Sequence, residues 1–265
     1  QLAPPFVEDD LAGPFPFAVT VREADALSLD AALSSAGPVD FTVGGNLALT
    51  ATIQSQNDLS FTSSGTMTGT AWLTTANGSI DVTATDVNIS GLTQVLTAPF
   101  DGFSTDVSIT ASNGGVTLGQ GVRAVNKIVI DQQGTGSIQS NGLLSAADVQ
   151  VFAEGDVDID TSASFVDVSV ASTVNGAANT ARTVTVDSDR DSQFRISTAG
   201  GTANVSALGV DNDNGTPGVV TDDIAALSLE LRETGVLSAT APQGSIDVIA
   251  VTSDELVMGV AADLL

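Results

Sequence analysis

The chain is poor in the residue types that carry out chemistry in enzymes. It contains no His, Cys or Tyr, and Lys127 is its single lysine. It therefore has no imidazole base, thiol nucleophile or phenol acid. Paired carboxylates of the kind that hydrolyse glycosidic bonds are abundant, but aromatic residues, which carbohydrate sites use as platforms, make up only 4% of the chain. We expect no enzymatic activity, and a polysaccharide-degrading enzyme is the least favoured reading.

The chemistry that the sequence does supply is the binding of hard cations by carboxylates. Asp211 and Asp213 alternate with asparagines ahead of Gly215, and Asp222 and Asp223 follow a few residues later. Acidic side chains at alternate positions before a glycine turn bring their oxygens together, as a calcium loop requires. The segment falls short of a complete calcium loop and lacks its bidentate glutamate, so an Asx-rich turn is the alternative. We predict a calcium site formed by these four aspartates.

Two other acidic segments are weaker candidates for a metal site. Segment 187–191 contains three aspartates, but Arg190 would compete for their carboxylates. Asp156, Asp158 and Asp160 alternate along a predicted strand, so their side chains share one face. Such a row of like charges either faces a salt solution or binds a metal.

The overall charge excludes several classes of partner. Seven basic residues against 32 acidic ones give a formal charge of −25. The chain cannot neutralise phosphates, so we expect no nucleic-acid partner and no attraction to an anionic membrane surface. Because no apolar stretch approaches the length of a membrane span, we also expect no membrane insertion. A surface this acidic suits a salty medium, where self-repulsion is screened.

A period of about twenty residues predicts the elements that would position these side chains. Self-similarity at such a fixed period is typical of a repeat architecture. Most members of the series lie in a short alternating stretch, such as Asp106-Val107-Ser108-Ile109, which is the pattern of a strand. The series consists of Leu27, Leu47, Met67, Val87, Val107, Ile128, Val149, Val168, Val184, Val205, Leu227 and Ile246.

A second aliphatic series runs roughly half a period out of phase, and several of its members follow a glycine turn. In Asn77-Gly78-Ser79-Ile80, for example, asparagine and glycine suit a sharp corner before the next strand. Two strands with a corner and a return in about twenty residues form one coil of a parallel β-helix. We therefore predict an all-β parallel β-helix, or β-solenoid, with tandem antiparallel β-sandwich domains as the alternative. The expected inward positions include Val87, Ile89, Val107, Ile109, Ile128, Val149, Val151, Val168 and Val170.

Both ends of the chain depart from the repeat. Residues 1–24 are rich in proline and phenylalanine, and proline keeps such a segment extended and outside a central ladder. We assign 1–24 to an arm or cap and 25–265 to the solenoid. The arm either covers the first coil or reaches a neighbouring subunit. At the other end no polar capping helix follows the last strand, and an open coil favours addition of another strand. We therefore expect either that the native chain continues beyond Leu265 or that this end stacks on a partner. The expected subunit contacts are Phe6, Phe15, Phe17, Leu264 and Leu265.

The glycine-turn coils resemble those of known bacterial surface proteins. Segments 244–248 (Gly-Ser-Ile-Asp-Val) and 111–118 (Ala-Ser-Asn-Gly-Gly-Val-Thr-Leu) are similar to the coils of filamentous-haemagglutinin-type adhesins. They resemble equally the giant, acidic, lysine-poor surface proteins of planctomycete and marine bacteria. The resemblance covers residues 26–260 and is one of texture and period, without a diagnostic motif. It implies an exported surface protein with a structural or adhesive role and no catalytic residues.

These observations together indicate a protein that works by assembly. We expect a structural subunit of an extracellular bacterial filament or cell-surface fibre, which assembles head to tail with copies of itself. A contact between an arm and an open coil is heterologous, and such contacts propagate into fibres unless they close a ring. The alternative is a monomeric segment of an adhesin that binds surface glycans.

Calcium is expected to raise the melting temperature of the protein. A ligand that binds only the native state stabilises that state by mass action. Calorimetric melting, first with calcium and then with excess chelator, measures the effect. An unchanged transition would contradict the calcium site and favour the Asx-rich turn.

Overall fold

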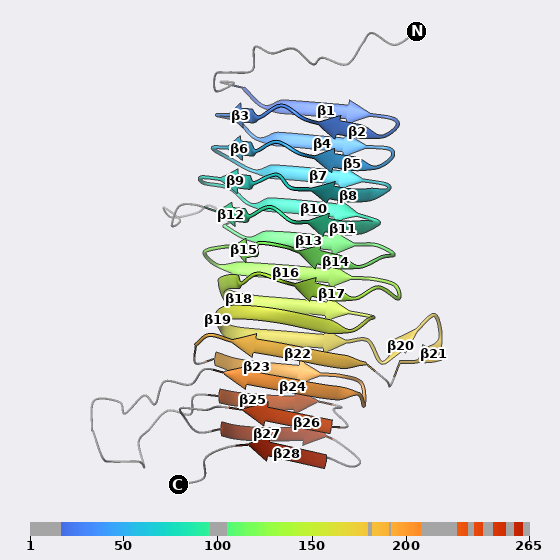
Figure 1. Ribbon diagram of the computed structural model, residues 1–265, viewed down its shortest axis with the longest axis vertical. Helices are drawn as coiled ribbons and strands as arrows, with labels where there is room; N and C mark the ends of the chain where they lie inside the picture. The colour runs from blue at the N-terminus through green and yellow to red at the C-terminus, as the bar shows by residue number, and fades with distance from the viewer. Residues whose placement is uncertain are drawn as a thin grey trace, which may run out of the picture.

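The chain folds into a parallel β-solenoid with coils of roughly 20 residues, as the sequence predicts. The computed structural model describes residues 17–95, 105–179, 182–190 and 192–207, followed by strands 227–232, 236–240, 246–252 and 257–261. These residues contain strands and no helix, and hence no helix that could span a membrane. Figure 1 shows the strands stacked along the long axis of a rod. Neighbouring coils pair in parallel, which rules out the antiparallel sandwich for this part of the chain.

Three ladders of parallel strands run along the rod. The first contains β1 (Val19–Glu23), β4 (Val39–Val43), β7 (Leu59–Ser63), β10 (Ile80–Ala84), β13 (Val107–Ala111), β16 (Lys127–Gln132), the C-terminal parts of β18 (Leu144–Ala153) and β19 (Val157–Val170), then β23 (Ser192–Ser197), β25 (Leu227–Arg232) and β27 (Ile246–Thr252). The second contains β2 (Leu27–Leu29), β5 (Leu47–Leu49), β8 (Thr66–Gly69), β11 (Asp86–Ile89), β14 (Val116–Leu118), β17 (Ile138–Ser140), the N-terminal part of β19, β22 (Thr183–Ser188), β24 (Thr202–Ala207), β26 (Val236–Thr240) and β28 (Val257–Ala261). The third contains β3 (Leu33–Ser35), β6 (Ile53–Ser55), β9 (Leu73–Thr75), β12 (Thr93–Val95), β15 (Val122–Arg123) and parts of β18 and β19.

The third ladder ends before the other two. Its last described pairing joins Ala146 to Ala163, and beyond that point each described coil contains one strand of each remaining ladder. The reason lies in chain length, because only residues 189–191 separate β22 from β23 and no third strand fits between them. A short antiparallel hairpin, β20 (Thr173–Val174) with β21 (Ala177–Ala178), projects from the rod near this step (Figure 1). The rod thus changes from three-stranded to two-stranded coils.

The regular period in the sequence conceals an exchange between ladders. Val87 belongs to the second ladder and stacks between Met67 and Val116. Val107 belongs to the first ladder and pairs with Ile80, although it continues the same twenty-residue series. The exchange occurs because the connection between β12 and β13, residues 96–106, is longer than the equivalent connection between β9 and β10, residues 76–79. The aliphatic series therefore does not follow a single stack beyond Val87.

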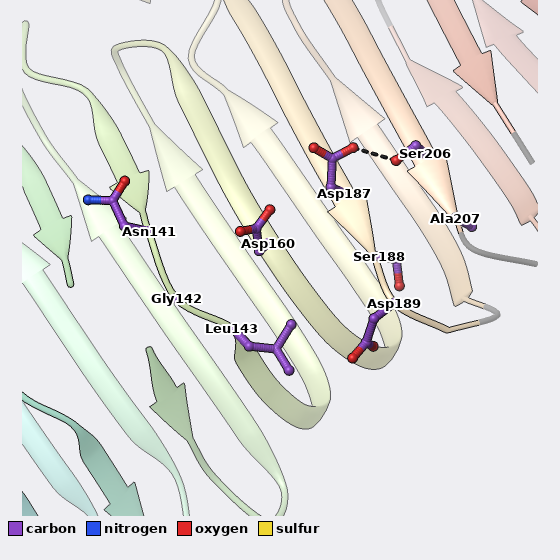
Figure 2. A pocket seen from close by; sticks show the side chains of 9 residues that line it. All are labelled: Asn141, Gly142, Leu143, Asp160, Asp187, Ser188, Asp189, Ser206 and Ala207. Carbon is purple, nitrogen blue, oxygen red and sulfur yellow. Dashed lines mark hydrogen bonds between the residues drawn. The ribbon is translucent and has the colours of Figure 1, made fainter. Parts of the chain in front are cut away.

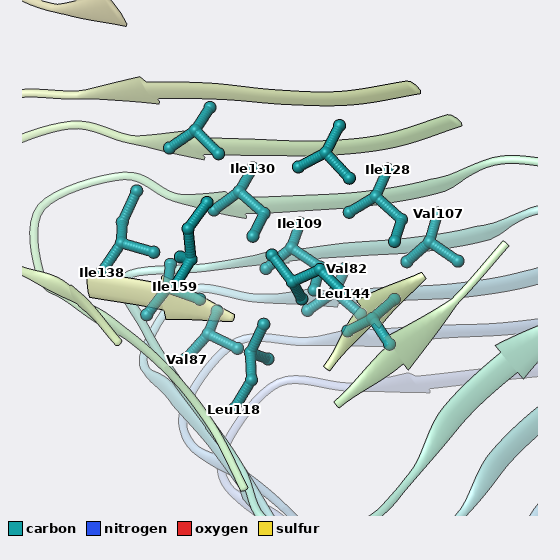
Figure 3. Close-up of a cluster of buried hydrophobic side chains, with 14 of the residues drawn as sticks. Val82, Val87, Val107, Ile109, Leu118, Ile128, Ile130, Ile138, Leu144 and Ile159 are labelled. Atoms are coloured by element: carbon teal, nitrogen blue, oxygen red, sulfur yellow. The ribbon is translucent and has the colours of Figure 1, made fainter. Parts of the chain in front are cut away.

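The inward positions form one continuous apolar core. Each of the expected inward residues is at most 3% exposed. In-register pairing places Val107, Ile128 and Val149 directly above one another, and Figure 3 shows this aliphatic layering. Phe41 and Phe61 are register partners whose rings stack with centroids 5.5 Å apart. Close packing of identical shapes in successive coils is the main source of stability for such a rod.

Buried polar side chains satisfy the backbone at the corners. The carbonyl of a corner residue points toward the next coil and needs a donor once it is buried. The Ser55 hydroxyl donates to Gly37 O at 2.8 Å, and the Ser63 hydroxyl donates to Gly45 O at 2.6 Å. Further along the first ladder, on β16, the Gln132 amide nitrogen donates to Gly114 O at 2.9 Å, and the amide oxygen accepts from Gly155 N. These side chains join each corner to a neighbouring coil.

The ladder begins earlier than the expected boundary at residue 25. β1 starts at Val19 and pairs in register with β4, so part of segment 1–24 belongs to the first coil. Residues 1–16 lie outside the described residues.

Substituting Phe61 by alanine is expected to lower the unfolding free energy by roughly 3–5 kcal/mol, because the cavity lies inside a closely packed stack. Phe152, which is 44% exposed on β18, supplies the matched control, and Phe152→Ala is expected to change stability by about 0.5 kcal/mol or less. Urea denaturation followed by circular dichroism measures both changes. Equal effects of the two substitutions would contradict the assigned core.

Candidate functional site

The four aspartates of the predicted calcium site lie outside the described residues. Asp211, Asp213, Asp222 and Asp223 all fall within segment 208–226. Their role in calcium binding stays a prediction. Within the described part of the chain, no group of three or more acidic residues is arranged so that it could hold a metal ion.

The structure brings together two acidic segments that the sequence analysis treated separately. Asp160 on β19 and Asp187 on β22 are register partners on the outer side of the second ladder. Asp187 in turn pairs with Ser206 of β24, whose hydroxyl donates to a carboxylate oxygen of Asp187. Figure 2 shows these side chains on adjacent strands, with the hydrogen bond drawn. The row of like charges therefore runs across the coils as well as along β19.

These aspartates line a shallow depression near the end of the third ladder. Its lining also includes Asn141, Leu143, Asp189 and Ala207. The exposed surface of the depression is largely apolar, and three aspartates, Asp160, Asp187 and Asp189, are among its lining residues (Figure 2). The depression could accept a positively charged group, but the acidic cluster alone identifies no ligand.

Asp160 shows the electrostatic consequence of this crowding. Desolvation raises the pKa of its carboxyl above the usual value, and the charges of Asp187 and Asp158 raise it further. An aspartate with a raised pKa in the folded state opposes folding when it is ionised. The row thus costs stability at neutral pH.

The sequence could not show that Asp160 and Asp187 are neighbours. Between them lie the C-terminal part of β19 and the hairpin β20–β21, which lengthen the coil beyond its normal period. Asp187 also lies in segment 187–191, which is a weaker candidate for a metal site because Arg190 would compete for its carboxylates. A register argument that allowed for the Asn175-Gly176 turn, where both residues have positive φ, could have found the pairing.

Of the expected subunit contacts, only Phe17 is described. Its side chain is 77% exposed, and its carbonyl accepts a hydrogen bond from the Ser35 hydroxyl at 3.0 Å. Phe6, Phe15, Leu264 and Leu265 lie outside the described residues. Phe17 directly precedes the first coil, which begins with β1 at Val19.

Comparison with known proteins finds no matching family model, no similar curated protein and no similar solved structure.

Replacing Asp160 by asparagine is expected to raise the melting temperature at neutral pH. The penalty is absent below the pKa of an unfolded aspartate, develops as pH rises through the higher folded pKa, and is complete at neutral pH. The gain from Asp160→Asn should therefore shrink toward zero as pH falls to about 3. Melting curves of both proteins between pH 3 and pH 7 measure this difference. A gain that is the same at every pH would contradict the electrostatic cause.

Proposed function

We propose that the chain is a structural subunit of an extracellular bacterial filament or surface fibre, and that copies of it stack head to tail. The proposal rests on the first coil. Val19, Val21, Leu27 and Leu29 point inward but are only partly buried. Their register partners in the next coil, Val39, Phe41, Leu47 and Leu49, are at most 1% exposed. The apolar core is therefore incompletely covered at this end of the described rod.

The backbone of the first coil supports the same proposal. β1 pairs with β4 along one edge, and no described strand pairs with its other edge. The Val19 N–H donates to Pro38 O, and the Glu23 carbonyl accepts from Gly44 N. Successive residues of a strand point their N–H and C=O groups to opposite edges. The backbone groups of Thr20 and Arg22 therefore point toward the free edge. An unpaired edge of this kind favours addition of another strand.

Composition agrees with an assembly protein outside the cell. The chain lacks cysteine and carries a charge of −25, so it needs no disulfide scaffold and suits a salty medium. Calcium would reduce repulsion between stacked copies and is therefore part of the proposal. A polysaccharide-degrading enzyme has the least support, since the chain contains no His, Cys or Tyr and only 4% of its residues are aromatic.

The competing function is a monomeric segment of a glycan-binding adhesin. It requires the open coil to be covered within a longer chain, and it predicts no growth in size with concentration. Electron microscopy of native material separates the two, because only a filament subunit gives continuous fibres.

Thr20→Pro is expected to abolish polymers without unfolding the protein. Proline removes the N–H that faces the free edge, while the ladder to β4 keeps its bonds. Thr20→Ala, which keeps the N–H, is the matched control and should polymerise as the wild type does. Sedimentation velocity and electron microscopy at high protein concentration with calcium measure the outcome. A wild-type protein that stays monomeric under these conditions would disprove the proposal.

A further inference from the structure

The rod is acidic overall, but its second and third described coils are almost uncharged. Between residues 41 and 80 the only ionisable side chain is that of Asp58. This segment contains the last three residues of β4, strands β5 to β9 and the start of β10. Its outer surface is therefore covered by hydroxyl, amide and small apolar side chains. A ligand at this surface needs no charge of its own.

A shallow, open groove crosses the outer side of the second ladder in this region. Its lining is uncharged and consists of Ala48, Leu49, Thr50, Thr68, Gly69, Thr70, Asn88 and Ser90. Ala48, Thr68 and Asn88 are register neighbours on β5, β8 and β11. Thr50, Thr70 and Ser90 form a second column, one position beyond the end of each strand. The groove lies between these two columns, so it follows the axis of the rod.

Gly69 lies in the middle of the lining and is the register partner of the buried Leu49. A Cβ atom at this position would lie 2.6 Å from Leu49 O and 3.1 Å from Leu49 Cβ. The contact with Leu49 O is shorter than real Cβ atoms show, so a larger residue here would require the backbone to shift. The backbone next to Gly69 is also tightly paired, since Thr70 N and Ala71 N both donate to Leu49 O.

Several polar groups of the groove face solvent and are available to a ligand. The side chains of Thr68, Thr70 and Asn88 are exposed, and among the described residues they form no intramolecular hydrogen bond. Thr50 and Ser90 differ, because their hydroxyls donate to Asp30 at 2.8 Å and to Gly69 O at 3.1 Å. Two threonine hydroxyls and one amide can both donate and accept, which matches the hydroxyl groups of a sugar.

Trp72, which is not itself a lining residue, is the exposed aromatic side chain nearest to the groove along the chain. It follows Thr70 by two positions and lies on the outer side, because the intervening Ala71 is buried. Its side chain is 47% exposed, although tryptophan is normally well covered in a folded protein. An indole ring combines a flat apolar face with an N–H donor, so it can stack on the apolar face of a sugar ring.

We propose that this groove and Trp72 bind a neutral polysaccharide of pyranose sugars. The uncharged lining gives no reason to bind a cation or an anion, while the exposed hydroxyl and amide groups favour a polyhydroxylated ligand. A groove aligned with the rod axis fits a linear chain better than a compact molecule. The proposal is independent of filament assembly, because all these residues lie within one chain and away from the first coil.

The test uses the full chain with three uncharged probes: cellulose, chitin and mannan, as insoluble particles and as soluble oligosaccharides. Trp72 is the single tryptophan of the chain, so intrinsic fluorescence reports directly on this surface. We expect saturable binding to at least one probe, with a change in tryptophan emission. Trp72→Ala should weaken particle binding at least tenfold, and Asn88→Ala should weaken it several-fold. Phe152→Ala, which removes an exposed aromatic ring from the first ladder, should leave binding unchanged.

Three results would overturn the proposal. The first is the absence of binding to all three probes at millimolar concentrations of sugar units. The second is equal binding by the wild type and Trp72→Ala, provided that both proteins melt at the same temperature. The third is a loss of self-association in Trp72→Ala without any sugar binding in the wild type, which would make this face a lateral contact between copies of the chain. Repeating the assay with the Thr20→Pro variant separates sugar binding from assembly.

Discussion

The in-register hydrogen bonding of each coil to the next is the constraint on which the whole structure depends. Parallel pairing fixes the rise at about 4.8 Å per coil and places every inward side chain on its equivalent in the neighbouring coil. The Phe41–Phe61 stack and the aliphatic column from Val107 to Val149 follow from it. The same constraint acts on the outer surface, where it generates columns of identical or similar groups. In the column of Ala48, Thr68 and Asn88 the neighbouring side chains are neutral and do not repel one another. The same register places the carboxylate of Asp160 beside that of Asp187, where the two charges repel.

The uncharged and the acidic columns of the outer surface differ in their electrostatic consequences. Where the columns are uncharged, the surface is open to a neutral ligand. Where they are acidic, the rod accepts a penalty that only protons, salt or cations relieve. Arg195 is a local exception, since it forms ion pairs with Asp167 at 3.5 Å and Glu230 at 3.2 Å and lies over the Phe165 ring. Arg195 thereby links three successive coils near the point where the number of strands in each coil falls from three to two.

The sequence predicted the repeat well because burial alternates with period two and corners need glycine or asparagine. It therefore identified the fold class and the inward residues such as Ile109 and Val151. It failed where coil length changes. The additional residues before Val107 shift the series to another ladder, and the hairpin β20–β21 hides the contact between Asp160 and Asp187. The groove was missed for a different reason: Trp72 and Asn88 are unremarkable in the sequence, and only the coil-to-coil register brings their neighbours together.

Paired cysteine substitutions test the register most directly, because the chain contains no cysteine of its own. In the structure Asn88 is the ladder partner of Thr117, whereas a strict twenty-residue repeat would pair it with Ser108. Ladder partners have a Cα separation of about 4.8 Å, which a disulfide can bridge. The Asn88→Cys/Thr117→Cys protein should therefore form an intramolecular disulfide on mild oxidation, and Asn88→Cys/Ser108→Cys should not. A disulfide in the second protein and none in the first would contradict the arrangement of the coils.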